Sequence, residues 1–229
     1  MKKKLLFELS NYFFFYRKFF LIIKAILKKK KLNKSYKNLE KIILKQKYIV
    51  NKNSIKINLN SNDKHKIKKF YLNIFKKKYY FISNEWNDKN QHSDIEIYFY
   101  KIRFNWLFFD NNHISIKQKI DLINSFILHY NYIESDSYSV GERVSNWIMF
   151  LQTNKKNLSM HNKNLFEQSI KKQIKLLINN LEFHKEKTNN HLFSNTKAIF
   201  LYSIYFESYE FLTLCRELFN FLSQHIFYK

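Results

Sequence analysis

Two groups of polar side chains interrupt apolar, helix-like sequence, and they contain the residue types best suited to chemistry. The first group comprises Tyr138, Arg143, Asn146 and Trp147. The second group comprises His184, Asn189, Asn190, His191 and Asn195. A buried polar group is costly unless it is hydrogen-bonded, so such residues either carry structural hydrogen bonds or face a cleft. Asn190 and His191 pair an amide donor with an imidazole just before the apolar run 198–206, and we expect them at the entrance of an open cleft.

The same residues have structural alternatives. Arg143 could form a buried ion pair, and Trp147 could simply pack in the core. Asparagine is abundant throughout the chain, so no single asparagine indicates a site by its type alone.

Other kinds of site find no support in the sequence. The eight histidines show no recognised metal-ligand spacing, so we expect no metal site. Gly141 is the only glycine, which excludes a glycine-rich phosphate loop and a GxSxG nucleophile elbow, and we expect no cofactor. Cys215 is the only cysteine and falls on the apolar side of a helical pattern, where a buried structural thiol is expected.

Hydrophobic periodicity predicts the elements that must position these residues. Residues 5–48 are typical of one or two helices, with a break near 28–31, and residues 49–110 indicate an irregular segment with short strands at 55–59 and 95–99. From 114 onward the spacing predicts successive helices with short connections, one of them opened by a capping box at Asn164 and Glu167. We therefore expect an all-α fold of antiparallel helical hairpins with a β-containing insert near 49–110. The two parts are 1–110 and 111–229.

Apolar positions at helical spacing define the expected core faces. They are Ile116, Ile120, Ile123, Ile127 and Tyr130, then Val144, Trp147, Ile148 and Leu151, then Ile170, Ile174, Leu177 and Leu181, and finally Phe211, Cys215, Leu218 and Leu222.

The composition of the 229 residues favours a polyanionic partner without identifying it. The formal net charge is +23, and only four of the basic residues are arginine. Nucleic acid, anionic lipid and acidic polysaccharide would all be attracted, although a bias toward AT-rich codons would produce the same lysine excess. Charges within the apolar segment 5–27 argue against a membrane span and a signal peptide. We expect a cytoplasmic or membrane-peripheral protein, in which this segment either packs on the fold or lies on an anionic membrane surface.

Three segments resemble the heparinase II/III-like polysaccharide lyases. Residues 138–148 resemble the family's Y-x-x-S-x-R-x-x-N-W segment, with Gly141 where serine is usual. Residues 181–200 resemble its L-E-x-H … N-H-L-x-A-N-x-K-A-L signature, with Ser194 where alanine is common. Trp86 and residues 100–104 resemble its W … Y-N-L-H-Y-F region, with Arg103 where histidine is usual. The resemblance covers about residues 80–225.

The resemblance implies an incomplete α/α toroid and a role in β-elimination on uronic-acid polysaccharides. By position, Asn190 would hydrogen-bond the carboxylate of the sugar, and His191 would act as base or position the substrate. Tyr138, Arg143, Trp147 and His184 would line the substrate groove.

In the family a β-sandwich domain follows the toroid, and we expect this chain to carry only the helical part. Relatives also carry a proton-transferring tyrosine and a further histidine downstream of the matched segments. We therefore expect a truncated or split lyase that is inactive or weakly active alone and could require a separately encoded carboxy-terminal half. An unfinished toroid would also expose the apolar face of its last helix at Phe211, Leu218, Phe219 and Leu222.

Two alternative functions belong to other classes. A non-catalytic module could bind an acidic glycan through its lysines. A basic nucleic-acid-binding protein is the third possibility, since lysines alternate with Phe70, Tyr71, Phe75, Tyr79 and Tyr80. No helix-turn-helix, RRM or KH signature supports that third reading.

Overall fold

The computed structural model describes residues 36–52, 69–74, 77–83, 85–90, 94–108, 114–130, 136–183 and 190–226. Within these residues the α-helices are α2 (Tyr36–Lys52), α3 (Ile95–Arg103), α4 (Ile116–His129), α5 (Ser137–Thr153), α6 (Met160–Asn179), α7 (Asn190–Tyr205) and α8 (Tyr209–Ile226). Strands β1 (Lys69–Ile74) and β2 (Lys77–Ile82) form an antiparallel hairpin, and short 3-10 turns lie at Asn105–Leu107 and Lys155–Asn157. A mostly helical fold with a small β-containing part between 49 and 110 is thus confirmed.

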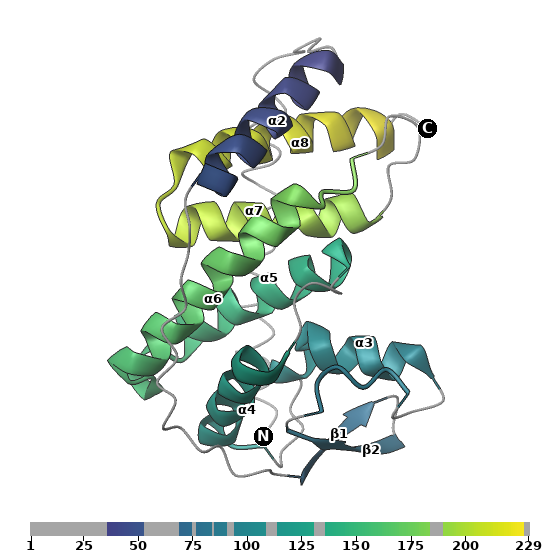
Figure 1. Cartoon of the computed structure of the whole chain (residues 1–229), viewed down its shortest axis with the longest axis vertical. Coiled ribbons are helices and arrows are strands. Elements are labelled where there is room, and N and C mark those ends of the chain that lie inside the picture. Colours follow the sequence, from purple (N-terminus) through teal and green to yellow (C-terminus); the bar gives the residue numbers. More distant parts are fainter. Residues whose placement is uncertain are drawn as a thin grey trace, which may run out of the picture.

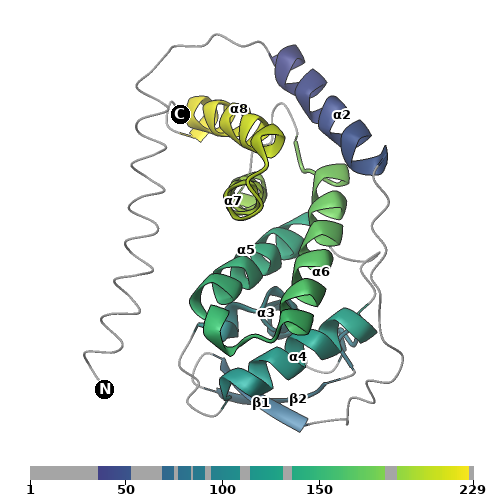
Figure 2. The same ribbon diagram turned by 90° about the vertical axis from the view of Figure 1, so that its left-hand side faces the viewer.

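Helices that alternate along the chain lie next to one another (Figure 1). Helix α5 packs against α3 on one side and α7 on the other, while α4 packs against α6. Helix α2 contacts both α6 and α8, and the β-hairpin lies at the end of the molecule formed by α3 and α4 (Figures 1 and 2). Helix α5 is therefore the central element, in contact with α3, α6 and α7.

The predicted strand at 95–99 is wrong, because this segment forms helix α3. Its buried residues are Ile97, Tyr98, Lys101 and Ile102, which repeat at helical and not at strand spacing. The Asp94 side chain caps the helix by accepting a hydrogen bond from the backbone N–H of Glu96. The predicted strand at 55–59 lies outside the described residues.

The observed strands occupy the lysine- and tyrosine-rich stretch that we interpreted as irregular. Leu72, Ile74 and Phe81 point into the core from one face of the hairpin, whereas the opposite face carries paired Tyr71 and Tyr80. Lysines between the aromatic residues mask this alternation in the sequence.

The helical faces predicted for α4 to α6 are largely confirmed. Ile120, Ile123 and Ile127 of α4 are buried, although Ile116 at its start is exposed. The faces of α5 and α6 are also in the core: Val144, Trp147, Ile148, Leu151, Ile170, Ile174 and Leu177.

The predicted start of α6 is wrong. The helix begins at Met160, because the side chain of Ser159 accepts a hydrogen bond from the backbone N–H of Asn162. Asn164 and Glu167 therefore lie inside the helix.

The expected exposure of the last helix is also wrong. Leu218, Phe219 and Leu222 of α8 are buried, and Phe211 is partly buried against the core. Helix α2, whose Leu39 and Ile43 are buried, packs against α8 and covers part of that surface. None of the helices among the described residues is long and apolar enough to cross a membrane.

An aromatic core holds the end of α3 against α4 and α5. Phe104 stacks on Trp86 with ring centroids 5.4 Å apart, and it meets Phe126 and Trp147 edge to face at 5.1 and 5.3 Å. Phe104 has a left-handed backbone with φ 58°, which a bulky residue adopts only when its surroundings fix it. This turn ends α3 directly after Arg103.

Candidate functional site

Helices α5 and α7 approach closely at Gly141. A Cβ atom at this position would lie 2.8 Å from Oδ1 of Asn195, which is closer than carbon and oxygen atoms pack. The buried Asn195 side chain also donates from Nδ2 to Oγ of Ser137 at 3.2 Å. The glycine therefore allows the two helices to touch near their amino-terminal ends.

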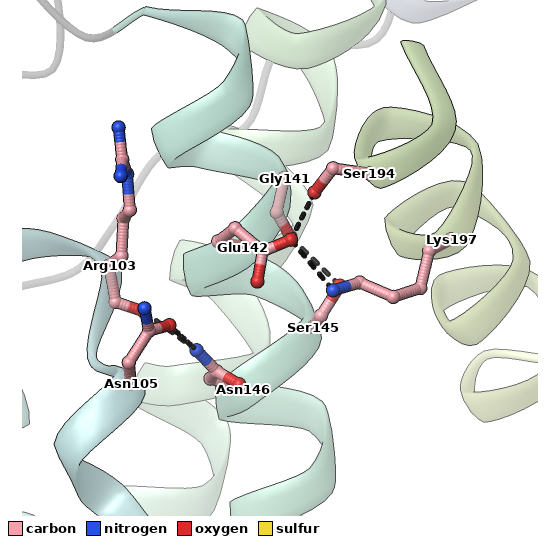
Figure 3. Close-up of polar contacts among 8 residues, drawn as sticks. All are labelled: Arg103, Asn105, Gly141, Glu142, Ser145, Asn146, Ser194 and Lys197. Atoms are coloured by element: carbon pink, nitrogen blue, oxygen red, sulfur yellow. Dashed lines mark hydrogen bonds and ion pairs between the residues drawn. The ribbon is translucent and has the colours of Figure 1, made fainter. Parts of the chain in front are cut away.

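A polar clamp holds the same two helices at Glu142, the residue after Gly141 (Figure 3). Oε1 of Glu142 accepts hydrogen bonds from Oγ of Ser194 and from Nζ of Lys197, the latter at 2.7 Å. Contacts advance together along both helices, from Tyr138 with His191 to Glu142 with Ser194 and Lys197. Helices α5 and α7 accordingly run in the same direction, with their amino-terminal ends side by side.

Asn146 connects the end of α3 to α5. Its Nδ2 donates to the backbone oxygen of Arg103 at 2.8 Å and to Oδ1 of Asn105 at 2.9 Å (Figure 3). These bonds place the Arg103 side chain beside the first turn of α5, where its Nε donates to Oγ of Ser139 at 3.0 Å. A nearby acidic group, Oε2 of Glu96, lies 3.6 Å from Nη1 of Arg103.

Three side chains from α3, α5 and α7 form a continuous stack at these helix ends. The guanidinium carbon of Arg103 lies 4.5 Å from the ring centroid of Tyr138. The Tyr138 ring in turn stacks on the imidazole of His191, with centroids 4.7 Å apart and planes at 19°. Nδ1 of His191 lies 2.8 Å from Oε2 of Glu182, which completes the group. We call Arg103, Tyr138, His191 and Glu182 the stacked cluster.

The surroundings of the stacked cluster carry charges of both signs. The amino-terminal ends of α5 and α7 each carry a partial positive charge and Arg103 adds a full one, while the carboxylates of Glu96 and Glu182 and the Asp136 cap of α5 offset them. The imidazole side chain of His191 is 45% exposed and Asn190, the first residue of α7, is exposed, so a ligand can reach this end of the helices. Arg103 is only 14% exposed, and its guanidinium lies against the rings of Phe99 and Tyr138.

The sequence-predicted residues fall into three groups. Tyr138, Asn190 and His191 lie together at the amino-terminal ends of α5 and α7. Arg143 and Trp147 are both completely buried on the inner side of α5. His184 lies outside the described residues.

The buried positions of Arg143 and Trp147 have clear physical causes. Arg143 donates from Nε to Oε1 of Gln173 at 2.5 Å and from Nη1 to the backbone oxygen of Ile102 at 3.0 Å, and it lies over the Phe126 ring. Trp147 packs edge to face on Phe104 and Phe126. In this arrangement neither side chain can reach a ligand at the stacked cluster.

Arg103 and Glu182 belong to the stacked cluster but were not assigned to the site from sequence. Arg103 stands where the family pattern usually has histidine, so the pattern did not indicate it as a site residue. Glu182 precedes His191 by nine residues, and its pairing with the imidazole depends on the chain reversal between α6 and α7. The only sequence signal for Glu182 is its place in the L-E-x-H pattern.

Elsewhere in the described part of the chain, burial shifts the pKa of single groups. Burial lowers the pKa of Lys101 to about 8, although Asp88 and Glu85 oppose the shift, and the ammonium group donates to the backbone oxygen of Glu85 at 3.0 Å. Burial raises the pKa of the Cys215 thiol, as expected for a structural cysteine. Within the described residues, no group of three or more His, Cys, Asp or Glu is arranged to hold a metal ion.

Comparisons with protein-family models, with curated proteins and with solved structures give no match to this chain.

Proposed function

We propose that this chain is the helical toroid part of a heparinase II/III-like protein and that its stacked cluster binds a uronic-acid polysaccharide. One observation carries the proposal. Segments that resemble the family separately in sequence, around residues 103, 138 and 191, contribute side chains to one stack at neighbouring helix ends. The stack lies at the end of α5 and α7 where Asn190 is exposed and the His191 side chain is 45% exposed.

The helix arrangement supports an incomplete α/α toroid. A toroid has an inner row of parallel helices, each followed by an antiparallel helix of an outer row. Helices α3, α5 and α7 lie in one row, α5 and α7 run in the same direction, and α4 packs against α6. Helix α2 adds to the outer row by lying against α6 and α8.

In the proposed reaction, the carboxylate of the sugar binds to the positive end of the stacked cluster. Arg103 and the Asn190 amide neutralise this carboxylate, which acidifies the neighbouring C5–H bond. A donor that stabilises the developing charge is worth about 3–4 kcal/mol of barrier. The Tyr138 ring, which is stacked against Arg103 and His191, holds these two side chains in place beside the sugar.

His191 then takes the C5 proton. The electrons of the C–H bond form the C4–C5 double bond, the C4–O bond breaks, and the leaving oxygen takes a proton from an acid. A well-placed base contributes about 10²–10⁴ in rate. The family resemblance assigns the acid to a tyrosine in a further segment, so binding is the more direct test of this chain.

The test compares a uronate polysaccharide with the same polymer after chemical reduction of its carboxylates to alcohols. Calorimetric titration should show binding of the carboxylated polymer, and Asn190→Ala and His191→Ala should each weaken it. Equal affinity for both polymers, or wild-type affinity in both variants, would contradict the proposal.

Product formation separates a lyase from a binding module. Elimination creates a conjugated double bond that absorbs in the far ultraviolet, and Asn190→Ala should abolish any rise in absorbance. Binding that depends on Asn190 and His191 with no absorbance rise, even after addition of a carboxy-terminal segment of the family, would instead favour a non-catalytic acidic-glycan-binding module.

A further inference from the structure

Glu182 occupies an unusual place between three elements. It lies just after α6, yet its carboxylate reaches the first residue of α5 and the second residue of α7. Oε1 accepts a hydrogen bond from Oγ of Ser137 at 2.5 Å, and Oε2 lies 2.8 Å from Nδ1 of His191. Both carboxylate oxygens are therefore used, and the side chain is 29% exposed.

The contact with Nδ1 determines which nitrogen of the imidazole can act as a base. A neutral imidazole carries one proton, and a carboxylate next to Nδ1 holds that proton at Nδ1 because it can only accept. Nε2 is then the nitrogen with the lone pair. The Tyr138 ring, which stacks on the imidazole at 4.7 Å, restricts its rotation.

We propose that Glu182 is a positioning residue that fixes His191 in the Nδ1–H tautomer and so makes Nε2 the proton-accepting atom. The catalytic meaning of this inference rests on the proposed lyase function, whereas the tautomer itself does not. Both oxygens of the Glu182 carboxylate have a partner: Oε1 accepts from Ser137, and Oε2 lies at Nδ1 of His191.

A purely structural role for Glu182 predicts something different. The bond to Ser137 ties the segment after α6 to the start of α5, and this link would stabilise the fold whatever the state of His191. Glu182→Gln separates the two roles. Glutamine keeps the length, and when its oxygen accepts from Ser137 its NH2 group faces Nδ1 and can only donate to it, which favours the Nε2–H tautomer.

The experiment measures the ¹⁵N chemical shifts of the histidine side chains in the full chain at a pH where they are neutral. His191→Gln identifies the signals of His191. The wild-type protein should show a protonated Nδ1 and an unprotonated Nε2, and Glu182→Gln should shift the majority of His191 to the Nε2–H tautomer. An Nε2–H tautomer in the wild type, or the same tautomer in both proteins, would overturn the inference.

Glu142→Gln is the matched control. Glu142 is also a partly buried glutamate between α5 and α7, but its partners are Ser194 and Lys197 (Figure 3). The same substitution there should leave the His191 tautomer unchanged. A change of tautomer in Glu142→Gln would show that any loss of charge at this interface has the effect, and the specific role of Glu182 would be wrong.

A kinetic measurement distinguishes this inference from the proposed function. If the wild-type chain, alone or with a carboxy-terminal segment, eliminates uronate polymers, Glu182→Gln should lower kcat by about 10²-fold with little change in KM. Unchanged kcat would overturn the positioning role. A tautomer change in a protein that never forms product would leave the Glu182–His191 relation intact and contradict only the lyase proposal.

Discussion

Position along a helix separates the roles of the polar residues on α5. Tyr138 lies in its first turn, where the helix end is exposed and its ring can stack on His191. Arg143 and Trp147 lie one and two turns further on, where α5 is enclosed by α3, α4 and α6 and both side chains become part of the core. The same motif therefore supplies both a candidate ligand contact and the packing that holds it in place.

Gly141 is the residue at which this arrangement depends most on a single atom. Gly141→Ala would place a methyl group 2.8 Å from Oδ1 of the buried Asn195 and should lower the free energy of unfolding by about 1–3 kcal/mol. Urea denaturation measures the change. In an Asn195→Ala background the blocking oxygen is gone, and alanine should be neutral or favourable, since it is better than glycine in a helix by about 1 kcal/mol. An equal loss in both backgrounds would show that the close contact is not the cause.

The buried ammonium of Lys101 predicts a pH-dependent stability. The folded protein releases the Lys101 proton near its pKa of about 8, whereas the unfolded chain keeps it up to the ordinary value of 10.5. Between these values the unfolded state binds more protons, so the free energy of unfolding rises with pH, by at most about 1.4 kcal/mol per pH unit.

Lys101→Met removes this titration and leaves the others unchanged. The difference in unfolding free energy, wild type minus variant, should therefore increase in favour of the wild type between pH 7.5 and about 9.5. Chemical denaturation of both proteins across this range provides the measurement. A constant difference would mean that Lys101 keeps its ordinary pKa in the folded protein.

At the scale of the element, the start of α6 offers a direct test of helix capping. Ser159→Ala removes the side chain that accepts from the backbone N–H of Asn162 and should cost about 1 kcal/mol. Asn164→Ala alters the residue that sequence pattern alone selects as the cap and should be neutral or slightly stabilising, because it lies inside the helix. Thermal and urea denaturation of the two variants compare the alternatives. A larger loss from Asn164→Ala would contradict the observed helix start.

The elements that could be predicted are those whose apolar faces repeat over several turns. Ile120, Ile123 and Ile127 specify α4 in this way, and the faces of α5 and α6 are equally clear. Short elements were less predictable. In α3 the alternation of Ile95, Ile97 and Phe99 imitates a strand. The helix start is instead marked by the hydrogen bond that the Asp94 side chain accepts from the backbone N–H of Glu96, which the sequence pattern does not reveal.

At the scale of the whole molecule, the candidate site could be predicted only in part. Sequence motifs selected Tyr138, Asn190 and His191, which the fold brings to neighbouring helix ends. They could not select Arg103, because its approach to Tyr138 depends on the Asn146 bonds and on the left-handed turn at Phe104. Sequence motifs also could not show that Arg143 and Trp147 are buried while Tyr138 is partly exposed, because this depends on which elements cover α5.

The net charge of +23 complicates any binding test, because it attracts every polyanion. At low ionic strength, Lys77→Met removes only long-range attraction, whereas Arg103→Met also removes the proposed direct contact, so both variants should weaken binding of a short uronate oligosaccharide. At about 1 M salt the screening length falls to about 3 Å, so long-range attraction is lost while direct contacts survive.

Under those conditions Arg103→Met should lower the affinity by about tenfold or more, because a charge-assisted hydrogen bond is lost, whereas Lys77→Met on the exposed surface of β2 should have no further effect. Calorimetric titration at both salt concentrations measures the two variants against the wild type. If both variants lose their effect together at high salt, oligosaccharide binding is a property of the overall charge, and the stacked cluster is not the carboxylate site.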